Sequence, residues 1–335
     1  SYAVFCLKKT FIPILVLAAG WDLDKGCITV SATVGNQTVS QAGGSPTVDH
    51  NPVITSSSGT TSNTVTITAE KNATANVILE NVNIDTGKTG GAAITASGEG
   101  NVNIELKGTN TVQSGNTHAG VEKKDNGTLT ITDEDKDGSL TATGGNYGAG
   151  IGGGYEGSGS NIAIEGGKVK AIGGTHGAGI GGGFGGSGSN IAIKGGKVEA
   201  SSDAGGAGIG GGISGTGSDV TISGDAQVKV QGGTTGRDWH KGAAIGNGGT
   251  PTTDGNEVSP NTSDLKVGGF IQIYEPGKNI NTDTPDRTIE GQKGDHSWNA
   301  GEVTTPATCT TPGVRTYTCT KDPAHTKTEP IPALN

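Results

Sequence analysis

Three consecutive blocks between residues 146 and 233 are nearly identical, and this internal repeat limits the possible folds more than any other feature. The blocks cover residues 146–174, 175–203 and 204–233, so that the first two are 29 residues long and the third is 30. Such a period is too short for a domain and too long for a helical heptad. It is typical of one supersecondary unit that stacks on copies of itself.

Each block contains three short stretches in which apolar residues alternate with small or polar ones. In the first block these are 149–151, 162–164 and 169–171. A period of two predicts β-strands, and the glycine-rich turns between them disfavour helices. Three such strands cannot bury a core as one flat sheet, but stacked coils can. We therefore predict an all-β fold, a right-handed parallel β-helix with three short strands per coil of about 29 residues.

The composition fits a solenoid better than a globular domain. Glycine accounts for 63 of 335 residues, 4% of residues are aromatic and 30% are hydrophobic. This would make a thin globular core, whereas a solenoid needs only a narrow apolar column. Disorder is the alternative, but the apolar residues recur in register. The net charge of −9 argues against a nucleic-acid partner.

The pattern divides the chain into four segments. Residues 1–20 resemble a secretory signal peptide, because two lysines precede a short apolar run; a strand or helix capping the first coil is the alternative. The run is too short to cross a bilayer, so we expect no membrane insertion. Residues 21–275 form the predicted β-helix, 276–294 a linker and 295–335 a small β-rich module.

The last segment holds a Cys2His2 set that could bind zinc. Its members are His296, Cys309, Cys319 and His325. A tetrahedral zinc site would explain how so small a module stays folded. A disulfide between Cys309 and Cys319, natural in an exported protein, is the alternative. Unpaired thiols are the third possibility.

A second candidate metal site lies before the repeats. Asp133, Asp135 and Asp137 match the beginning of an EF-hand calcium loop, but the twelfth position is Gly144 instead of glutamate. The sequence predicts weak calcium binding there or, alternatively, a solvated acidic turn.

Aromatic residues recur at fixed places around the first strand of each block. Gly150, Gly179 and Gly208 are expected on its outer side, as a ribbon without side chains; an inward-facing ribbon is the alternative. Sugar rings stack on aromatic faces, so the flanking rings are candidates for carbohydrate binding; covering turns or filling corners is their other possible role. The candidate set is Tyr147, Tyr155, His176, Phe184 and, in an insertion after the third block, Trp239.

The block GNYGAGIGGGYEGSGSNIAIEGGKVKAIGG (145–174) resembles the glycine-rich β-helices of secreted or surface proteins of anaerobic Gram-positive bacteria, described as carbohydrate-binding-domain proteins. The tail HSWNAGEVTTPATCTTPGVRTYTC (296–319) resembles a small module of the same proteins. That module commonly has a third cysteine, where this chain has KDPAH (321–325), which leaves His325 as the substitute ligand. The resemblance implies a secreted or surface-attached segment of a larger protein, whose partners are polysaccharides or host or cell-surface glycans.

The resemblance carries no catalytic signature, and we expect a non-enzymatic carbohydrate-binding or adhesin segment. A passive stalk that displays other domains is the alternative. A polysaccharide lyase or hydrolase is the third hypothesis. Pectin-cleaving β-helices need clustered aspartates and a basic residue on one face, whereas Ala163, Ala192 and Thr221 occupy the outward positions of the middle strand.

Overall fold

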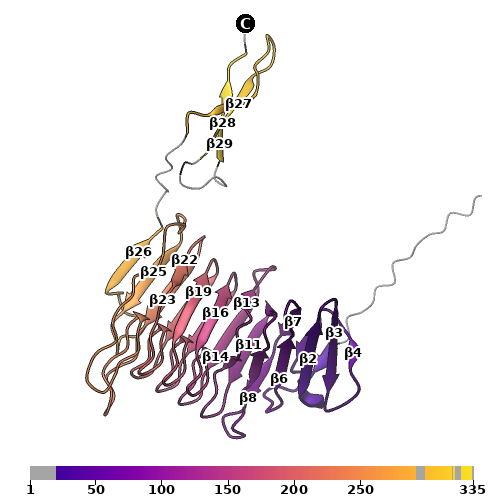
Figure 1. Ribbon diagram of the computed structural model, residues 1–335, viewed down its shortest axis with the longest axis vertical. Coiled ribbons are helices and arrows are strands. Elements are labelled where there is room, and N and C mark those ends of the chain that lie inside the picture. Colours follow the sequence, from indigo (N-terminus) through magenta and orange to yellow (C-terminus); the bar gives the residue numbers. More distant parts are fainter. Residues whose placement is uncertain (1–19, 292–298, 319, 321–325, 334–335) are drawn as a thin grey trace, which may run out of the picture. The chain divides into compact units, whose positions relative to one another are not determined.

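The computed structural model describes residues 20–291, 299–318, 320 and 326–333. The chain divides into two units, residues 1–290 and 291–335, which are described separately. The first unit is a parallel β-helix whose coils follow one another from the N-terminal to the C-terminal end (Figure 1). The predicted fold class is therefore confirmed.

Three sheets form the sides of the β-helix. Sheet A contains, in spatial order, β1 (Gly20–Asp22), β5 (Val53–Thr55), β7 (Thr74–Glu80), β10 (Asn101–Lys107), β13 (Leu129–Thr132), β16 (Gly159–Ile164), β19 (Gly188–Ile193) and β22 (Val220–Ile222). Sheet B contains β4 (Thr47–Val48), β3 (Asn36–Gln41), β2 (Ile28–Thr33), β6 (Val65–Ala69), β9 (Ile94–Ser97), β12 (Val121–Lys123), β15 (Ile151–Gly152), β18 (Ile180–Gly181), β21 (Ile209–Gly210) and β24 (Ile245–Gly246). Sheet C contains β8 (Asn83–Asp85), β11 (Thr109–Gln113), β14 (Ser139–Thr143), β17 (Lys168–Ile172), β20 (Lys197–Ser201), β23 (Gln227–Gln231), β25 (Phe270–Tyr274) and β26 (Arg287–Glu290).

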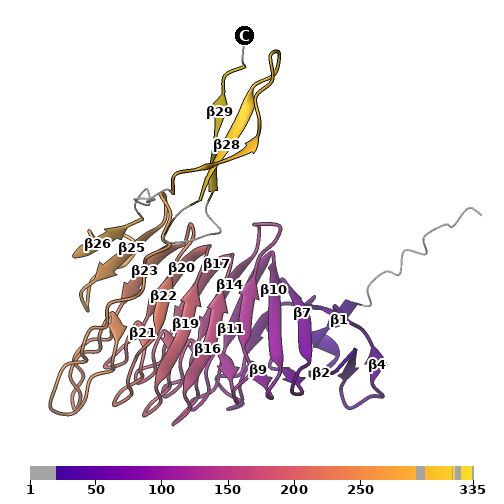
Figure 2. The same cartoon turned by 45° about the horizontal axis from the view of Figure 1, so that its top comes forward.

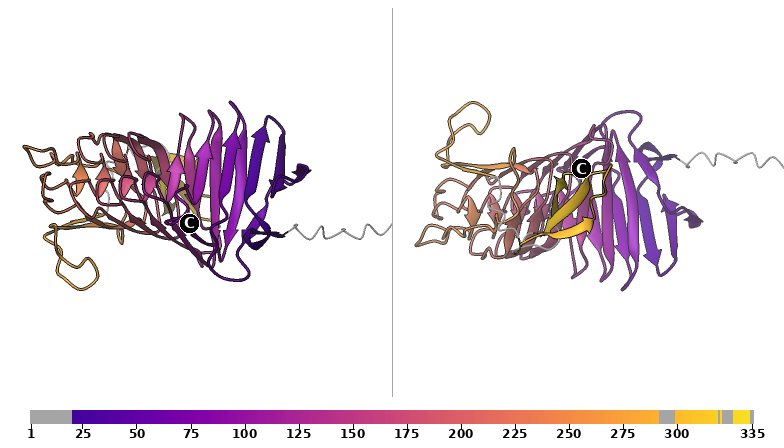
Figure 3. Two further views of the ribbon diagram at one scale, coloured as in Figure 1. Left: turned by 90° about the horizontal axis from the view of Figure 1, so that it is seen from below. Right: turned by 90° about the horizontal axis from the view of Figure 1, so that it is seen from above.

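Each central coil passes through sheet B, then sheet A, then sheet C, so that equivalent strands of successive coils pair in parallel (Figures 2 and 3). The register follows the repeat: Ile151 pairs with Ile180, and Ile180 pairs with Ile209. All three side chains are fully buried. The predicted first strand begins two residues later than the alternation indicated, at Ile151.

The core is a set of aliphatic columns that run through the coils. In sheet A, for example, Ile131, Ile164 and Ile193 occupy successive positions of one column and are fully buried. Burying such a side chain contributes roughly 1.5–3 kcal/mol. Because a coil buries this surface only against its neighbours, the coils stabilise one another.

Both ends of the columns are covered by irregular elements. At the N-terminal end β3 pairs with β2 and with β4 in antiparallel fashion, and Leu23–Lys25 forms a short 3-10 helix, η1, with Leu23 buried. At the C-terminal end β26 pairs antiparallel with β25. Residues 287–290, within the segment expected to be a linker, thus extend sheet C.

The second unit contains a small antiparallel sheet, in agreement with the predicted β-rich module. Its strands are β27 (Glu302–Thr305), β28 (Gly313–Thr318) and β29 (Thr326–Ile331). Cys309 is exposed on the connection between β27 and β28. The other members of the proposed zinc or disulfide site, His296, Cys319 and His325, lie outside the described residues. The same holds for residues 1–19 of the signal-like segment.

Among the residues that the structure describes, no helix is long and apolar enough to cross a membrane.

Candidate functional site

The structure brings the five candidate aromatic residues together in one cluster on the β-helix. Tyr147 stacks on His176 with ring centroids 5.0 Å apart, and Tyr155 stacks on Phe184 with centroids 5.6 Å apart. Both stacks follow the coil repeat, because each pair of rings occupies equivalent positions 29 residues apart. The 29-residue spacing therefore accounts for both stacks, which we call the two aromatic ladders.

The two ladders touch each other edge to face. Ring centroids are 5.6 Å apart for Tyr147 and Tyr155, 5.8 Å for Tyr147 and Phe184, and 5.8 Å for His176 and Phe184. Backbone hydrogen bonds hold the loops in this order: the Phe184 N–H donates to the Tyr147 carbonyl at 2.8 Å, and the Tyr155 N–H donates to that of Thr117 at 2.7 Å. The rings thus alternate along the axis as one zigzag.

The two ends of the aromatic cluster differ in exposure. At the C-terminal end Trp239, from the insertion after the third block, lies edge to face against Phe184 at 5.7 Å and against His176 at 6.4 Å. At the other end Tyr155 is 47% exposed. Tyr155 is therefore the most exposed ring of the cluster, and Phe184 covers one of its faces.

A pocket of about 550 Å³ opens beside Tyr155. We call it the Tyr155 pocket. Polar and charged residues of the preceding coil line it. Its lining includes Thr117, His118, Glu122, Lys124, Asp125 and Asn126. Hydrogen-bond donors and acceptors therefore converge next to an exposed aromatic ring. The carboxylate of Glu156 raises the pKa of the Tyr155 phenol.

Glu122 is the most constrained polar group of the Tyr155 pocket. Its side chain is almost fully buried; one carboxylate oxygen lies 2.7 Å from His118 Nδ1 and accepts the Ala119 N–H at 3.2 Å. The other oxygen lies 3.1 Å from Lys124 Nζ. Buried carboxylates of this kind are held in one orientation by their partners.

Sequence reasoning missed Glu122, although the repeat contains a signal for it. Glu122 pairs in register with Gly152, so it occupies a position that is glycine in each later coil. The next residue, Lys123, is 5% exposed, and burial lowers the pKa of its ammonium group. The sequence itself therefore shows the signal: two charged residues, Glu122 and Lys123, stand in a strand whose later copies contain none.

The glycine ribbon does not face solvent, so the expectation that it lies on the outer side is wrong. Gly150, Gly179 and Gly208 are all buried. A Cβ on Gly150 would lie 2.5 Å from the backbone nitrogen of Ile172 and 2.7 Å from the carbonyl oxygen of Gly179. These glycines lie at the corner between sheets B and C, where the backbones approach too closely for any side chain.

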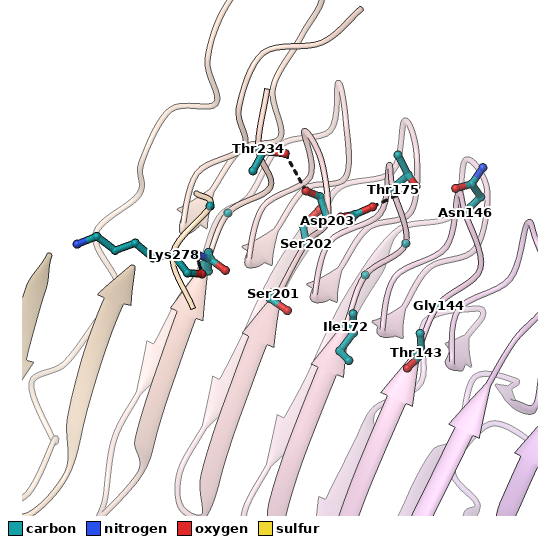
Figure 4. A pocket seen from close by; sticks show the side chains of 15 residues that line it. Thr143, Gly144, Asn146, Ile172, Thr175, Ser201, Ser202, Asp203, Thr234 and Lys278 are labelled. Atoms are coloured by element: carbon teal, nitrogen blue, oxygen red, sulfur yellow. Dashed lines mark hydrogen bonds between the residues drawn. The ribbon is translucent and has the colours of Figure 1, made fainter. Parts of the chain in front are cut away.

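A polar groove runs along the axis at the same corner (Figure 4). Its floor is one register row of sheet C, formed by Thr143, Ile172, Ser201 and Gln231. Its wall is formed by residues of the connecting loops, namely Asn146, Thr175, Asp203 and Thr234, and Lys278 lies at one end. The Thr175 hydroxyl donates to Asp203 at 3.4 Å. The cavity volume is about 550 Å³.

The candidate calcium loop forms a turn between β13 and β14. Asp133 accepts a hydrogen bond from the Gly138 N–H at 3.1 Å, while Asp135 and Asp137 are exposed. Within residues 20–291 and the described parts of the C-terminal unit, no group of three or more histidine, cysteine, aspartate or glutamate side chains is placed to hold a metal ion.

Comparison with known families identifies the coils. Residues 136–155, 162–184 and 191–213 match a family described as "Beta helix repeat". The match describes a repeat and names no activity. Searches of curated proteins and of solved structures found no significant match to this chain.

Proposed function

We propose that this β-helix is a non-enzymatic carbohydrate-binding segment, and that a sugar ring stacks on Tyr155 and occupies the Tyr155 pocket. One observation carries the proposal: a 47%-exposed aromatic ring, backed by a packed aromatic cluster, borders a pocket lined by polar groups. The ligand class is a polysaccharide or a host or cell-surface glycan.

The chemistry of the Tyr155 pocket suits a sugar. A pyranose has an apolar face of C–H groups, which an aromatic ring can cover, and a rim of hydroxyls that both donate and accept hydrogen bonds. Binding sites for small ligands combine such an apolar surface with a few fixed polar groups. Here Glu122 and Asp125 accept, Lys124 donates, and the Asn126 amide does both.

The rigidity of the Tyr155 pocket supports binding. Glu122 is in contact with His118, Lys124 and the Ala119 N–H, so its carboxylate is held in one orientation. A pre-organised site also lowers the entropy cost of binding.

The proposal places the chain outside the cell, as an adhesin or glycan-binding segment of a larger surface protein. The apolar run that follows Lys8 and Lys9 supports export, since this layout is typical of secretory signals.

Replacement of Tyr155 with alanine is expected to weaken glycan binding about tenfold or more, because the stacking surface is lost. The measurement is a glycan-array screen followed by titration calorimetry with the best ligand. Tyr155→Phe should bind nearly as well as the original protein, since the ring remains. Tyr317→Ala, in the separate C-terminal unit, is the matched control and should leave binding unchanged.

Three results would contradict this proposal. Equal binding by the protein and by Tyr155→Ala would place the ligand elsewhere. Failure to bind any glycan at high concentration would support a passive stalk. Release of reducing or unsaturated sugar from the bound glycan would show an enzyme.

A further inference from the structure

The outer face of sheet C carries a concentration of positive charge in an acidic protein. The chain as a whole has a net charge of −9. Yet the outward positions of three neighbouring strands, β17, β20 and β23, hold four lysines and a single carboxylate. The lysines are Lys168, Lys170, Lys197 and Lys229, and the carboxylate is Glu199.

The register aligns these charges along the solenoid axis. Lys168 pairs directly with Lys197, and Lys170, Glu199 and Lys229 follow one another in the neighbouring row. Paired strands are about 4.8 Å apart, so like charges on adjacent strands repel. The pair Lys168 and Lys197 therefore lowers stability unless an anion lies beside it.

The two lysines of this pair are available to a ligand. Both are exposed, and neither forms an ion pair with another residue in the described part of the chain. Lys170 Nζ lies 3.8 Å from Glu199 Oε2, so the carboxylate of Glu199 is already partly neutralised. Lys229 donates to the backbone carbonyl of Ile280 at 3.3 Å, where the segment after β25 crosses the face.

The lysine face is continuous with the polar groove of Figure 4. Lys170 and Ile172 are outward positions of the same strand, two residues apart, and therefore about 7 Å apart. A hollow of about 450 Å³ lies over the lysines, next to the groove. The two hollows therefore lie side by side on one surface: ammonium groups gather in the lysine hollow, and hydroxyl and amide groups with the Asp203 carboxylate line the groove.

We propose that the outer face of sheet C binds a linear acidic polysaccharide that lies along the solenoid axis. Its carboxylate or sulfate groups contact Lys168 and Lys197, and its hydroxyls contact Ser139 and Gln227, which continue the same register row on the neighbouring strands and line the same hollow. The inference extends the proposed function to a second ligand class at a second surface. It shares no residue with the Tyr155 pocket.

The test compares one polysaccharide backbone with and without charge, and it adds a second acidic polysaccharide. Dextran, dextran sulfate and alginate fragments of matched length are titrated into the protein, with a DNA duplex as an anion that is not a glycan. We expect alginate and dextran sulfate to bind at low salt and dextran to bind far more weakly. Binding should decrease as salt is added, because the ion pairs are screened.

The double variant Lys168→Gln/Lys197→Gln is expected to weaken binding of the acidic glycans roughly three- to tenfold. The control Lys71→Gln/Lys194→Gln removes the same charge from two exposed lysines outside sheet C and should leave affinity nearly unchanged. Equal losses in both variants would reduce the effect to net charge and overturn the inference. Equally tight binding of the DNA duplex would overturn it too.

Tyr155→Ala separates this inference from the proposed function. The variant should retain acidic-glycan binding, even if it loses the ligand of the Tyr155 pocket. Loss of alginate binding in Tyr155→Ala would place the acidic glycan at that pocket and contradict the assignment to sheet C. If alginate binding is retained but no glycan is found that depends on Tyr155, the proposed function is contradicted and this inference is not.

Discussion

Replacing Gly181 with alanine is expected to lower the free energy of unfolding by about 3–5 kcal/mol. Gly181 has a φ of +134°, a conformation that residues with a side chain rarely adopt. A Cβ on it would also lie 2.0 Å from the carbonyl oxygen of Gly210 in the next coil. Strain and steric overlap therefore act together at this position.

The clash at Gly181 cannot be relieved locally. Gly152, Gly210 and Gly246 have equivalent conformations, with φ between +137° and +139°, and each would place a Cβ close to the next backbone. Moving one coil away from its neighbour would break the hydrogen bonds between their parallel strands and disrupt the aliphatic columns. We expect the variant to unfold at lower urea concentration when followed by circular dichroism.

Gly236→Ala is the matched control. Gly236 lies in the insertion after the third block, it lacks a positive φ, and a Cβ there would lie 3.9 Å from the nearest atom. Its substitution should change stability by less than about 0.5 kcal/mol. If Gly181→Ala were equally harmless, the close packing of the Gly181 and Gly210 backbones would be wrong.

Truncation of Ile164 to alanine should lower the free energy of unfolding by about 2–5 kcal/mol, and Ile164→Val by about 0.5–1.5 kcal/mol. Ile164 is fully buried and lies between Ile131 and Ile193 in its column. Hydrogen bonds between parallel strands hold the neighbouring coils in place, so these coils cannot close the cavity that the truncation leaves. Urea titration of the three proteins measures the series.

The outward neighbour of Ile164 provides the control. Ala163 lies on the other face of β16, so Ala163→Ser leaves the aliphatic columns intact and should have a small effect. If Ile164→Ala and Ala163→Ser cost the same, the inward and outward faces of sheet A would be misassigned. Since a repeat protein can unfold in parts, the transition should be followed both by circular dichroism and by tryptophan fluorescence.

The candidate site shows where reasoning from the repeat succeeded and where it stopped. The stacks of Tyr147 on His176 and of Tyr155 on Phe184 follow directly from the 29-residue spacing. The contact between the two ladders does not, because it depends on how the loop that carries Tyr155 folds back against Thr117. Phe184 makes the equivalent hydrogen bond to Tyr147, so Tyr155 is the more exposed ring because the aromatic stack ends there.

The sequence alone determined the coil, its three strands and its inward columns. The alternation of apolar residues within a strand and the 29-residue period between coils can both be read directly from the order of the residues. Only the tertiary structure decided which side of a glycine faces another backbone, since glycine has no side chain whose polarity could mark it. It also decided that Glu122 lies beside Tyr155 and that a hollow lies over the lysines of sheet C. Those neighbours are distant along the chain, and only the register between coils brings them together.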